Sequence, residues 1–172
     1  VLIRTAFSGL CHSDLHFIEG LYPHPLPVVL GHEAAGVVEE VGSEVRYVKK
    51  GDHVITCLSV FCGVCENCNA GRPVICLDTE VKTLPGQAKR LSLKGSHVNT
   101  FTNLSSHAEK MLVHENSMVK IDKEFPLDRA ALIGCGVITG FGAAVNTAKV
   151  APGETVAVIG CGGVGQAVIQ GA

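Results

Sequence analysis

Four cysteines lie close together in the middle of this chain, at Cys62, Cys65, Cys68 and Cys76, with the spacing C-x2-C-x2-C-x7-C. A gap of two residues lets neighbouring sulfurs point into one small volume, and four thiolates fill the tetrahedral shell that zinc prefers. Disulfides and unrelated buried cysteines are the alternatives, but three thiols within seven residues are badly spaced for separate disulfides. The spacing therefore predicts a structural zinc lobe over about residues 57–80, in a closed site that performs no chemistry.

Composition limits what the rest of the chain can do. The chain has 172 residues, of which 47% are hydrophobic, and a net charge of −2. That length is ample for one packed domain, and the near-neutral charge gives no reason to expect nucleic acid or an anionic membrane as a partner. The apolar stretch 156–172 is broken by glycines and two glutamines, which is typical of a buried strand and turn rather than a membrane span. We expect neither nucleic acid nor membrane as a partner.

Cysteine usage indicates the compartment. The chain has eight cysteines, and most of them have a better use as thiolate ligands than as disulfides, which favours the reducing cytoplasm. The sequence begins at Val1, within an apolar run that is typical of a strand, so we expect residues upstream of it.

Short apolar runs separated by glycines predict an irregular, all-β body. A polar, mixed-charge excursion is expected from 77 to 106, and small residues with helix-compatible spacing follow from 126 to 148. The predicted strands of the body are 1–6, 36–42, 111–113 and 118–121, and a turn followed by another short strand is predicted within 51–55.

The last segment changes class. An apolar strand is predicted at Thr155–Ile159, followed by a glycine turn and then by a helix from Gln166 onward. This order is typical of the opening of a Rossmann unit, in which glycines let the backbone approach a pyrophosphate at a helix N-terminus. Because the acidic residue that reads the ribose usually lies about 20 residues further on, we expect further βα units after Ala172. The turn residues predicted to contact the cofactor are Gly160, Gly162, Gly163, Val164 and Gly165.

Three more motifs flank the cysteine lobe in a fixed order. They are Gly9-Leu10-Cys11-His12-Ser13-Asp14-Leu15-His16, Gly31-His32-Glu33 and Gly134-Cys135-Gly136-Val137-Ile138-Thr139-Gly140. Together with the lobe, they resemble the zinc-dependent alcohol dehydrogenases of the medium-chain dehydrogenase/reductase superfamily, over almost the whole chain. The resemblance implies a mainly β fold with α: a GroES-like irregular β-barrel catalytic domain at 1–148, then the truncated start of a Rossmann dinucleotide-binding domain at 149–172.

The resemblance implies a second, catalytic zinc held by Cys11, His32 and Cys135. Two cysteines and one histidine with an open fourth position form the known ligand set of alcohol dehydrogenases, so this is an assignment by likeness. Zinc at that position would lower the pKa of an alcohol, which would release hydride to a nicotinamide. We therefore expect two Zn2+ ions per chain and NAD or NADP as cofactor, with NAD favoured.

Residues beside the ligands receive roles by the same resemblance. Ser13 is expected to take the alcohol proton, and His16 to pass it to solvent. Asp14 is expected to hold the imidazole of His32, and Glu33 to lie near the metal.

Two further residues are assigned to the cofactor: His12 to its pyrophosphate and Thr139 to its nicotinamide. Other interpretations of the neighbouring residues stay open. Ser13 and Asp14 are types that cap a helix, and His16 is also compatible with a plain surface histidine.

One residue departs from the family pattern. His107 stands where the resemblance leads us to expect an aromatic residue lining the substrate channel, whereas the region around Leu58 favours an apolar alcohol. The sequence thus predicts a zinc-dependent oxidoreductase that acts on a small alcohol, or its aldehyde or ketone, and forms a homo-oligomer, a dimer or tetramer. A thiol-adduct formaldehyde dehydrogenase is the alternative among enzymes, and a non-catalytic, zinc-stapled GroES-like structural or interaction protein is the alternative of another class.

Overall fold

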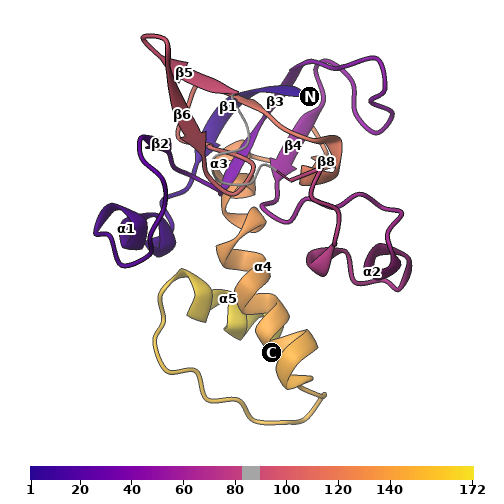
Figure 1. Cartoon of the computed structure of the whole chain (residues 1–172). Helices are drawn as coiled ribbons and strands as arrows, with labels where there is room; N and C mark the ends of the chain where they lie inside the picture. The colour runs from indigo at the N-terminus through magenta and orange to yellow at the C-terminus, as the bar shows by residue number, and fades with distance from the viewer. Residues whose placement is uncertain (83–89) are drawn as a thin grey trace.

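The computed structural model describes residues 1–82 and 90–172, and two β-sheets form its body (Figure 1). The larger sheet is antiparallel, in the order β7-β1-β3-β4-β8. In the smaller sheet, of order β2-β6-β5, β2 runs parallel to β6 and β5 antiparallel to it. The strands are β1 (Leu2–Ser8), β2 (Val28–Val29), β3 (Ala34–Glu40), β4 (His53–Thr56), β5 (Leu91–Leu93), β6 (Ser96–Thr100), β7 (Lys110–Leu112) and β8 (Met118–Ile121).

The core lies against the larger sheet. Ile3 of β1 is opposite Val38 of β3, and both are buried together with Val54 of β4. Leu104, which follows the smaller sheet, joins the same cluster, so the two sheets meet through apolar side chains. A second buried cluster joins β3 and β4 to the first helical turns after the sheet.

Short helices connect and extend the sheets. Figure 1 shows α1 and the lobe that carries α2 on opposite sides of the body, with α4 leading away from it and α5 beside α4. The helices are α1 (His12–Ile18), α2 (Glu66–Asn69), α3 (Leu127–Ala130), α4 (Gly136–Gly142) and α5 (Gly163–Gly171). Single 3-10 turns lie at Pro73–Ile75, Glu115–Ser117 and Ala131–Gly134, and a π-helical segment, Ala143–Ala148, extends α4.

The prediction of a mainly β body with helices is confirmed, but a closed barrel is not observed. Within the described ranges, the strands form two open sheets. In the larger sheet, β7 and β8 are the two edge strands. β2 has only two residues and pairs with β6, so no continuous hydrogen-bonded ladder joins the sheets. Part of the predicted 77–106 excursion is also wrong, since β5 and β6 lie within it; its residues 83–89 lie outside the described part.

The C-terminal segment confirms the predicted helix and contradicts the predicted strand. α5 begins at Gly163, slightly before the expected Gln166. Residues 155–159, which are described, form no strand, and Ile159 is fully exposed. A parallel strand needs a neighbouring strand to pair with its backbone groups, and none of the eight described strands lies beside this segment.

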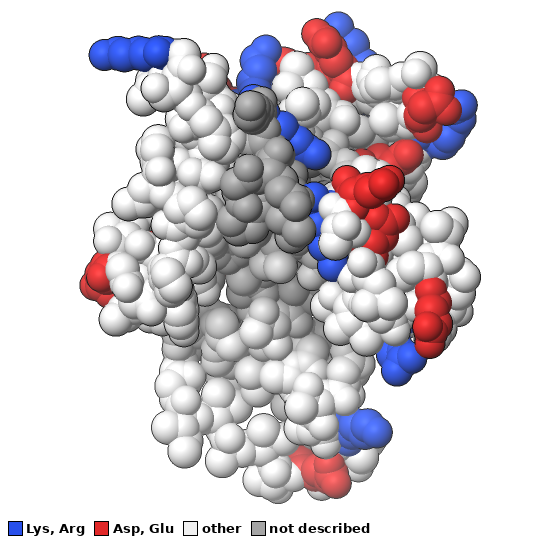
Figure 2. Space-filling model, viewed as in Figure 1, with Lys and Arg blue, Asp and Glu red and all other residues white. Residues whose placement is uncertain are grey.

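Charged side chains of both signs are mixed on the face shown in Figure 2. Among the described residues, no single helix has the length and apolar character needed to cross a membrane. One pair of consecutive helical segments, Leu127–Gly134 and Gly136–Ala148, meets those criteria jointly but is bent by 54°.

Candidate metal centres

The four thiols of the lobe converge on one point. Their sulfurs lie within 4.8 Å of one another. Zinc–sulfur bonds of about 2.3 Å imply tetrahedral edges of about 3.8 Å between sulfurs. The observed edges fit: 3.5 Å for Cys65–Cys68, 3.7 Å for Cys62–Cys76, 3.8 Å for Cys65–Cys76 and 4.0 Å for Cys62–Cys68. All eight cysteines of the chain are free thiols, and a disulfide would need sulfurs about 2.05 Å apart.

Backbone amides support this cluster. The amides of Val64 and Cys65 donate to the sulfur of Cys62 at 3.4 and 3.3 Å. Hydrogen bonds from the backbone of Leu77 and Cys68 lower the pKa of Cys65 to about 6, whereas burial raises the pKa of Cys68 to about 11. Four sulfurs this close repel one another as anions, so the donor set fits a divalent cation that accepts four thiolates.

A second group assembles from distant parts of the chain. Ligand atoms of Cys11, His32, Glu33 and Cys135 lie within 4.8 Å of one another. Cys11 is the residue before α1, His32 and Glu33 precede β3, and Cys135 lies at the start of α4. The structure therefore brings together all three predicted ligands of the open site, with Glu33 beside them.

Two glycines allow these segments to approach. Gly31, directly before His32, has φ +94°, and a Cβ there would collide with Ser106 and with the backbone of His107. Gly134, directly before Cys135, leaves no room for a Cβ because the carbonyl oxygen of Thr56 lies against it. Larger side chains at either position would displace the adjoining ligand residue.

Asp14 ties two of the ligand segments together. Its side chain is buried, and its carboxylate accepts the amides of Cys11 at 3.2 Å and of Gly31 at 3.0 Å. One carboxylate oxygen also lies 3.4 Å from Nδ1 of His32, although this contact lacks hydrogen-bond geometry. The capping interpretation and the His32 interpretation of Asp14 thus both describe what this side chain touches.

The open group crowds acidic side chains in a buried place. His32 and Glu33 are 3% and 5% exposed. Burial, and then the nearby Cys11 and Glu33, raise the pKa of Cys135 to about 12. A cation among these donors would relieve that repulsion, so two sulfurs and an imidazole beside a carboxylate fit a zinc ion.

A hollow of about 720 Å³ opens on one side of this group. It brings together Ser13, His12 and Thr139 with Gly163 and Val164 of α5, from opposite ends of the chain. The remaining predicted turn glycines, Gly160, Gly162 and Gly165, are not part of its lining.

A second hollow, of about 460 Å³, opens on the other side. Cys135 and Thr139 line both hollows, so the metal group lies where the two meet. The other walls of the second hollow include Leu58, Phe61 and Val74, so this hollow is mostly apolar. The predicted role of the Leu58 region thus corresponds to an apolar wall beside the open centre.

Two predicted histidines lie apart from these linings. The ring of His16 contacts the ring of His12 edge-on at 4.7 Å and that of Tyr22 at 5.4 Å, one helical turn from the first hollow. Nε2 of His107 lies 3.2 Å from the carbonyl oxygen of Gly9. His107 does not line either hollow as the structure describes them, in contrast to the substrate-channel position expected for it.

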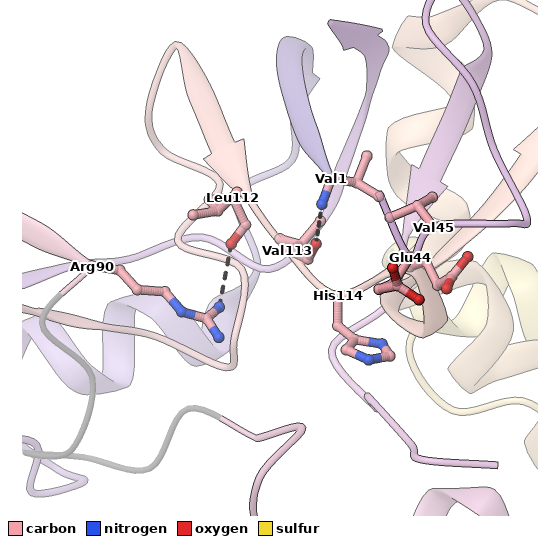
Figure 3. Close-up of a pocket in the computed structure, with 8 residues that line it drawn as sticks. Val1, Glu44, Val45, Arg90, Leu112, Val113 and His114 are labelled. Carbon is pink, nitrogen blue, oxygen red and sulfur yellow. Dashed lines mark hydrogen bonds between the residues drawn. The ribbon is translucent and has the colours of Figure 1, made fainter. Parts of the chain in front are cut away.

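A third hollow, of about 340 Å³, lies away from both metal groups (Figure 3). In it, the Val1 amino group donates to the carbonyl oxygen of Val113 at 2.9 Å, and Arg90 donates to that of Leu112 at 3.4 Å. None of the predicted site residues lines it.

Sequence reasoning missed several residues of the centres. Ala167 and Gln170 of α5 line the first hollow, each four residues after another lining residue, Gly163 and Gln166 respectively. That helical spacing was a usable signal. Phe101, whose ring lies against His32, carries no such signal because it follows a strand far from any motif.

Residues 1–123 match the family described as the alcohol dehydrogenase GroES-like domain. The chain is 46% identical to S-(hydroxymethyl)glutathione dehydrogenase from Saccharomyces cerevisiae, covering all of this chain and 46% of that protein. It is 45% identical to the protein of the same name from Escherichia coli O1:K1 / APEC, covering 48% of it. The chain thus spans about half the length of the curated relatives it matches.

Solved structures share this fold. An alcohol dehydrogenase zinc-binding domain protein from Burkholderia ambifaria superposes with a TM-score of 0.88 at 38% identity, over 99% of this chain and 48% of that one. Benzyl alcohol dehydrogenase from Acinetobacter calcoaceticus superposes with a TM-score of 0.85 at 36% identity, over 99% and 47%. The predicted GroES-like class of the body is confirmed by these matches.

Proposed function

Because the chain belongs to the family of the alcohol dehydrogenase GroES-like domain, we propose that the protein is a zinc-dependent oxidoreductase. It would transfer a hydride between a primary or secondary alcohol, or the matching aldehyde or ketone, and NAD(P). The observation that carries this proposal is the convergence of Cys11, His32 and Cys135 where two hollows share Cys135 and Thr139.

The two hollows suit two different reactants. The first includes His12, Thr139 and the N-terminal turn of α5, a place where backbone amides and an imidazole can meet a phosphate group. The second is lined by Leu58, Val74 and Ile138, which suit an apolar alcohol. Hydride transfer needs both reactants at one point, and the shared wall provides it.

The residues of the chain then divide the work. Zinc, when bound, lowers the pKa of an alcohol hydroxyl, and the nicotinamide accepts a hydride. Cys11, His32 and Cys135 would hold the ion, while Asp14 keeps the first two segments in register through their backbone amides. Ser13 Oγ would accept the substrate proton at the rim of the first hollow, and His16 would deliver it to solvent.

The direct test is turnover coupled to metal content. We expect NAD reduction with benzyl alcohol and simple primary alcohols, and we expect a chelator to remove one zinc quickly together with activity. The four-thiolate site should retain its ion under the same conditions because it has no open position. Activity that survives loss of the labile ion would contradict the proposal.

A second candidate function rests on the similarity at 46% and 45% identity to two S-(hydroxymethyl)glutathione dehydrogenases. In that case the substrate would be the adduct of formaldehyde with a thiol. Turnover of formaldehyde that depends on added glutathione, with little activity on benzyl alcohol, would favour this candidate. A non-catalytic protein stapled by zinc is disfavoured because the complete donor set of the open centre is present.

Several finer properties belong to the same proposal. We propose two zinc ions per chain, a preference for NAD over NADP, and a homo-oligomer. The cytoplasm suits the eight free thiols. We propose domain limits at 148/149, supported by the end of the π-helical segment at Ala148 and the left-handed backbone of Lys149.

A further inference from the structure

The imidazole of His32 is buried, but it lacks the hydrogen bond that would normally fix the orientation of a metal-binding histidine. The side chain is 3% exposed, and its Nδ1 makes no hydrogen bond, although a carboxylate oxygen of Asp14 lies 3.4 Å away. A hydrogen bond to the second ring nitrogen is the usual way to fix the orientation of a metal-binding histidine. Here another contact must share that task.

Phe101 provides this contact. Its ring is 4% exposed and meets the His32 ring at 5.7 Å between centroids, with an interplanar angle of 66°. The other side of Phe101 rests on Phe17 of α1, at 4.7 Å and 71°. Both are edge-to-face contacts, which favour one relative orientation of the rings. The His32 ring therefore has a defined wall.

The backbone around Phe101 is held in an unfavourable conformation. Thr102, Asn103 and Ser105 have φ of +51°, +63° and +57°, although none is glycine. Such residues persist only where the surrounding structure determines them, and they concentrate at functional positions. In this turn the amide of Phe101 donates to Ser105 Oγ at 2.9 Å, and Thr102 Oγ1 donates to the Phe101 carbonyl at 2.8 Å.

The turn is also fastened to the segment that carries His32. β2 pairs with β6 so that Val29 lies opposite Thr100, the residue before Phe101. At the other end of the turn, the amide of Ser106 donates to the carbonyl of Gly31, and that of His107 to the carbonyl of Leu30, both at 3.0 Å. Phe101 and His32 therefore sit on two backbone segments joined on both sides of the contact.

We infer that Phe101 is a positioning residue for His32: the strained 101–105 turn presses its ring against the buried imidazole and fixes the direction of the ligand nitrogen. This inference rests on the proposed metal centre at Cys11, His32 and Cys135. It assigns the smaller sheet a purpose in that centre, although the sheet itself contributes no ligand.

The test compares Phe101→Leu with Phe17→Leu in the zinc-loaded protein. Both variants remove a ring from the same aromatic stack, but only Phe101 touches His32. We expect Phe101→Leu to release the chelator-labile zinc roughly 10–100-fold faster, and to change the visible absorption bands of the cobalt-substituted open site. Phe17→Leu, which removes only the support behind Phe101, should have a clearly smaller effect on both readouts, and Phe101→Tyr, which keeps the ring, should leave them near those of the wild type. The four-thiolate site provides an internal reference for metal loss.

Thr102→Gly is the second variant, in case Phe101→Leu fails to fold. Glycine adopts φ +51° without strain, so the fold should be kept. The more flexible turn would hold Phe101 less firmly against His32, and zinc loss should become faster. Equal readouts for Phe101→Leu and Phe17→Leu, or a Thr102→Gly protein with unchanged zinc loss, would overturn the inference while leaving the metal centre intact. A wild-type protein without any labile zinc would instead overturn the proposed centre itself.

Discussion

The cysteine lobe collects its four thiols from 15 consecutive residues, 62–76, whereas the open centre collects three ligands from segments spread over 125 residues, 11–135. In the lobe, backbone amides of the same loop reach the sulfurs. Around the open centre, a buried carboxylate, two tight glycines and an aromatic ring from the turn after β6 hold the predicted ligand residues. A metal site whose ligands are close together in the sequence thus stabilises the loop around it. A site whose ligands are far apart in the sequence depends on a fold that already exists.

The largest expected effect is on the lobe. Cys65→Ala should lower the free energy of unfolding by several kcal/mol, since zinc binding at a closed site contributes on the order of 10 kcal/mol to folding. Soluble yield, thermal melting and zinc content measure this, and zinc should fall from two ions per chain to one. Cys161→Ala, which removes an exposed thiol outside both centres, is the matched control. Equal melting temperatures for the two variants would mean that the lobe does not stabilise the fold.

Cys135→Ala should give the opposite phenotype. We expect a soluble, folded protein whose turnover falls by about 10³-fold, because a metal centre supplies several kcal/mol of transition-state stabilisation. Cys57→Ala is the control, since the Cys57 thiol lines the second hollow, as Cys135 does, but lies outside the ligand group. Steady-state rates and circular dichroism check the result. If Cys135→Ala unfolds as Cys65→Ala does, the division between the two centres fails.

The proton path sharpens the comparison, because only the open centre should have one. Ser13→Ala should lower alcohol oxidation by about 10²–10⁴-fold with both zinc ions retained. His16→Gln should have a smaller effect, chiefly near and below neutral pH, where external base is scarce. Imidazole buffer should partly rescue the His16 variant and not the Ser13 variant. A pH–rate profile unchanged by His16→Gln would assign that histidine to the surface.

The smallest expected effect concerns Asp52, the residue directly before β4. Asp52 is buried, and its carboxylate accepts the Lys49 amide and the Lys120 ammonium, both at 3.0 Å. The Lys49 hydrogen bond, followed by Lys120, lowers the pKa of Asp52. The carboxylate therefore stabilises the fold above its unfolded pKa of about 3.9, and this contribution is lost as pH falls through the lowered value.

Asp52→Asn should consequently lower stability by about 1–3 kcal/mol near pH 7, with the difference from the wild type narrowing below about pH 4. Thermal melting across pH measures it. Zinc loss from the two centres should change little and by similar factors, since Asp52 touches neither. A stability difference that is constant from pH 7 to pH 3 would exclude this carboxylate as its source.

The sequence predicted the lobe directly, because a two-residue gap between cysteines leaves few other geometries. The open centre needed the resemblance, since nothing in the spacing of Cys11, His32 and Cys135 shows that the chain returns to one point. Its support was harder to foresee. The contact of Phe101 with His32 arises from the pairing of β2 with β6, a register that no local pattern encodes.

The incorrect predictions have physical causes of their own. The run Thr155–Ile159 has strand composition, but composition does not supply the neighbouring strand that a parallel pairing requires. The GroES-like barrel was implied by the resemblance, and the class is confirmed; closure itself depends on ladder contacts between the end strands, and β7 and β8 are edges in the described sheet.

The order of the ligands along the chain also determines which metal site is completed first during synthesis. The lobe is complete once Cys76 has emerged, while the open centre must wait for Cys135, 59 residues later. At about 5–20 residues per second, that interval lasts roughly 3–12 s. During it the ribosome-bound chain can already sequester one zinc ion in the lobe, with Cys11 and His32 still lacking their third partner. A cell short of zinc would on this schedule complete the lobe of each new chain first.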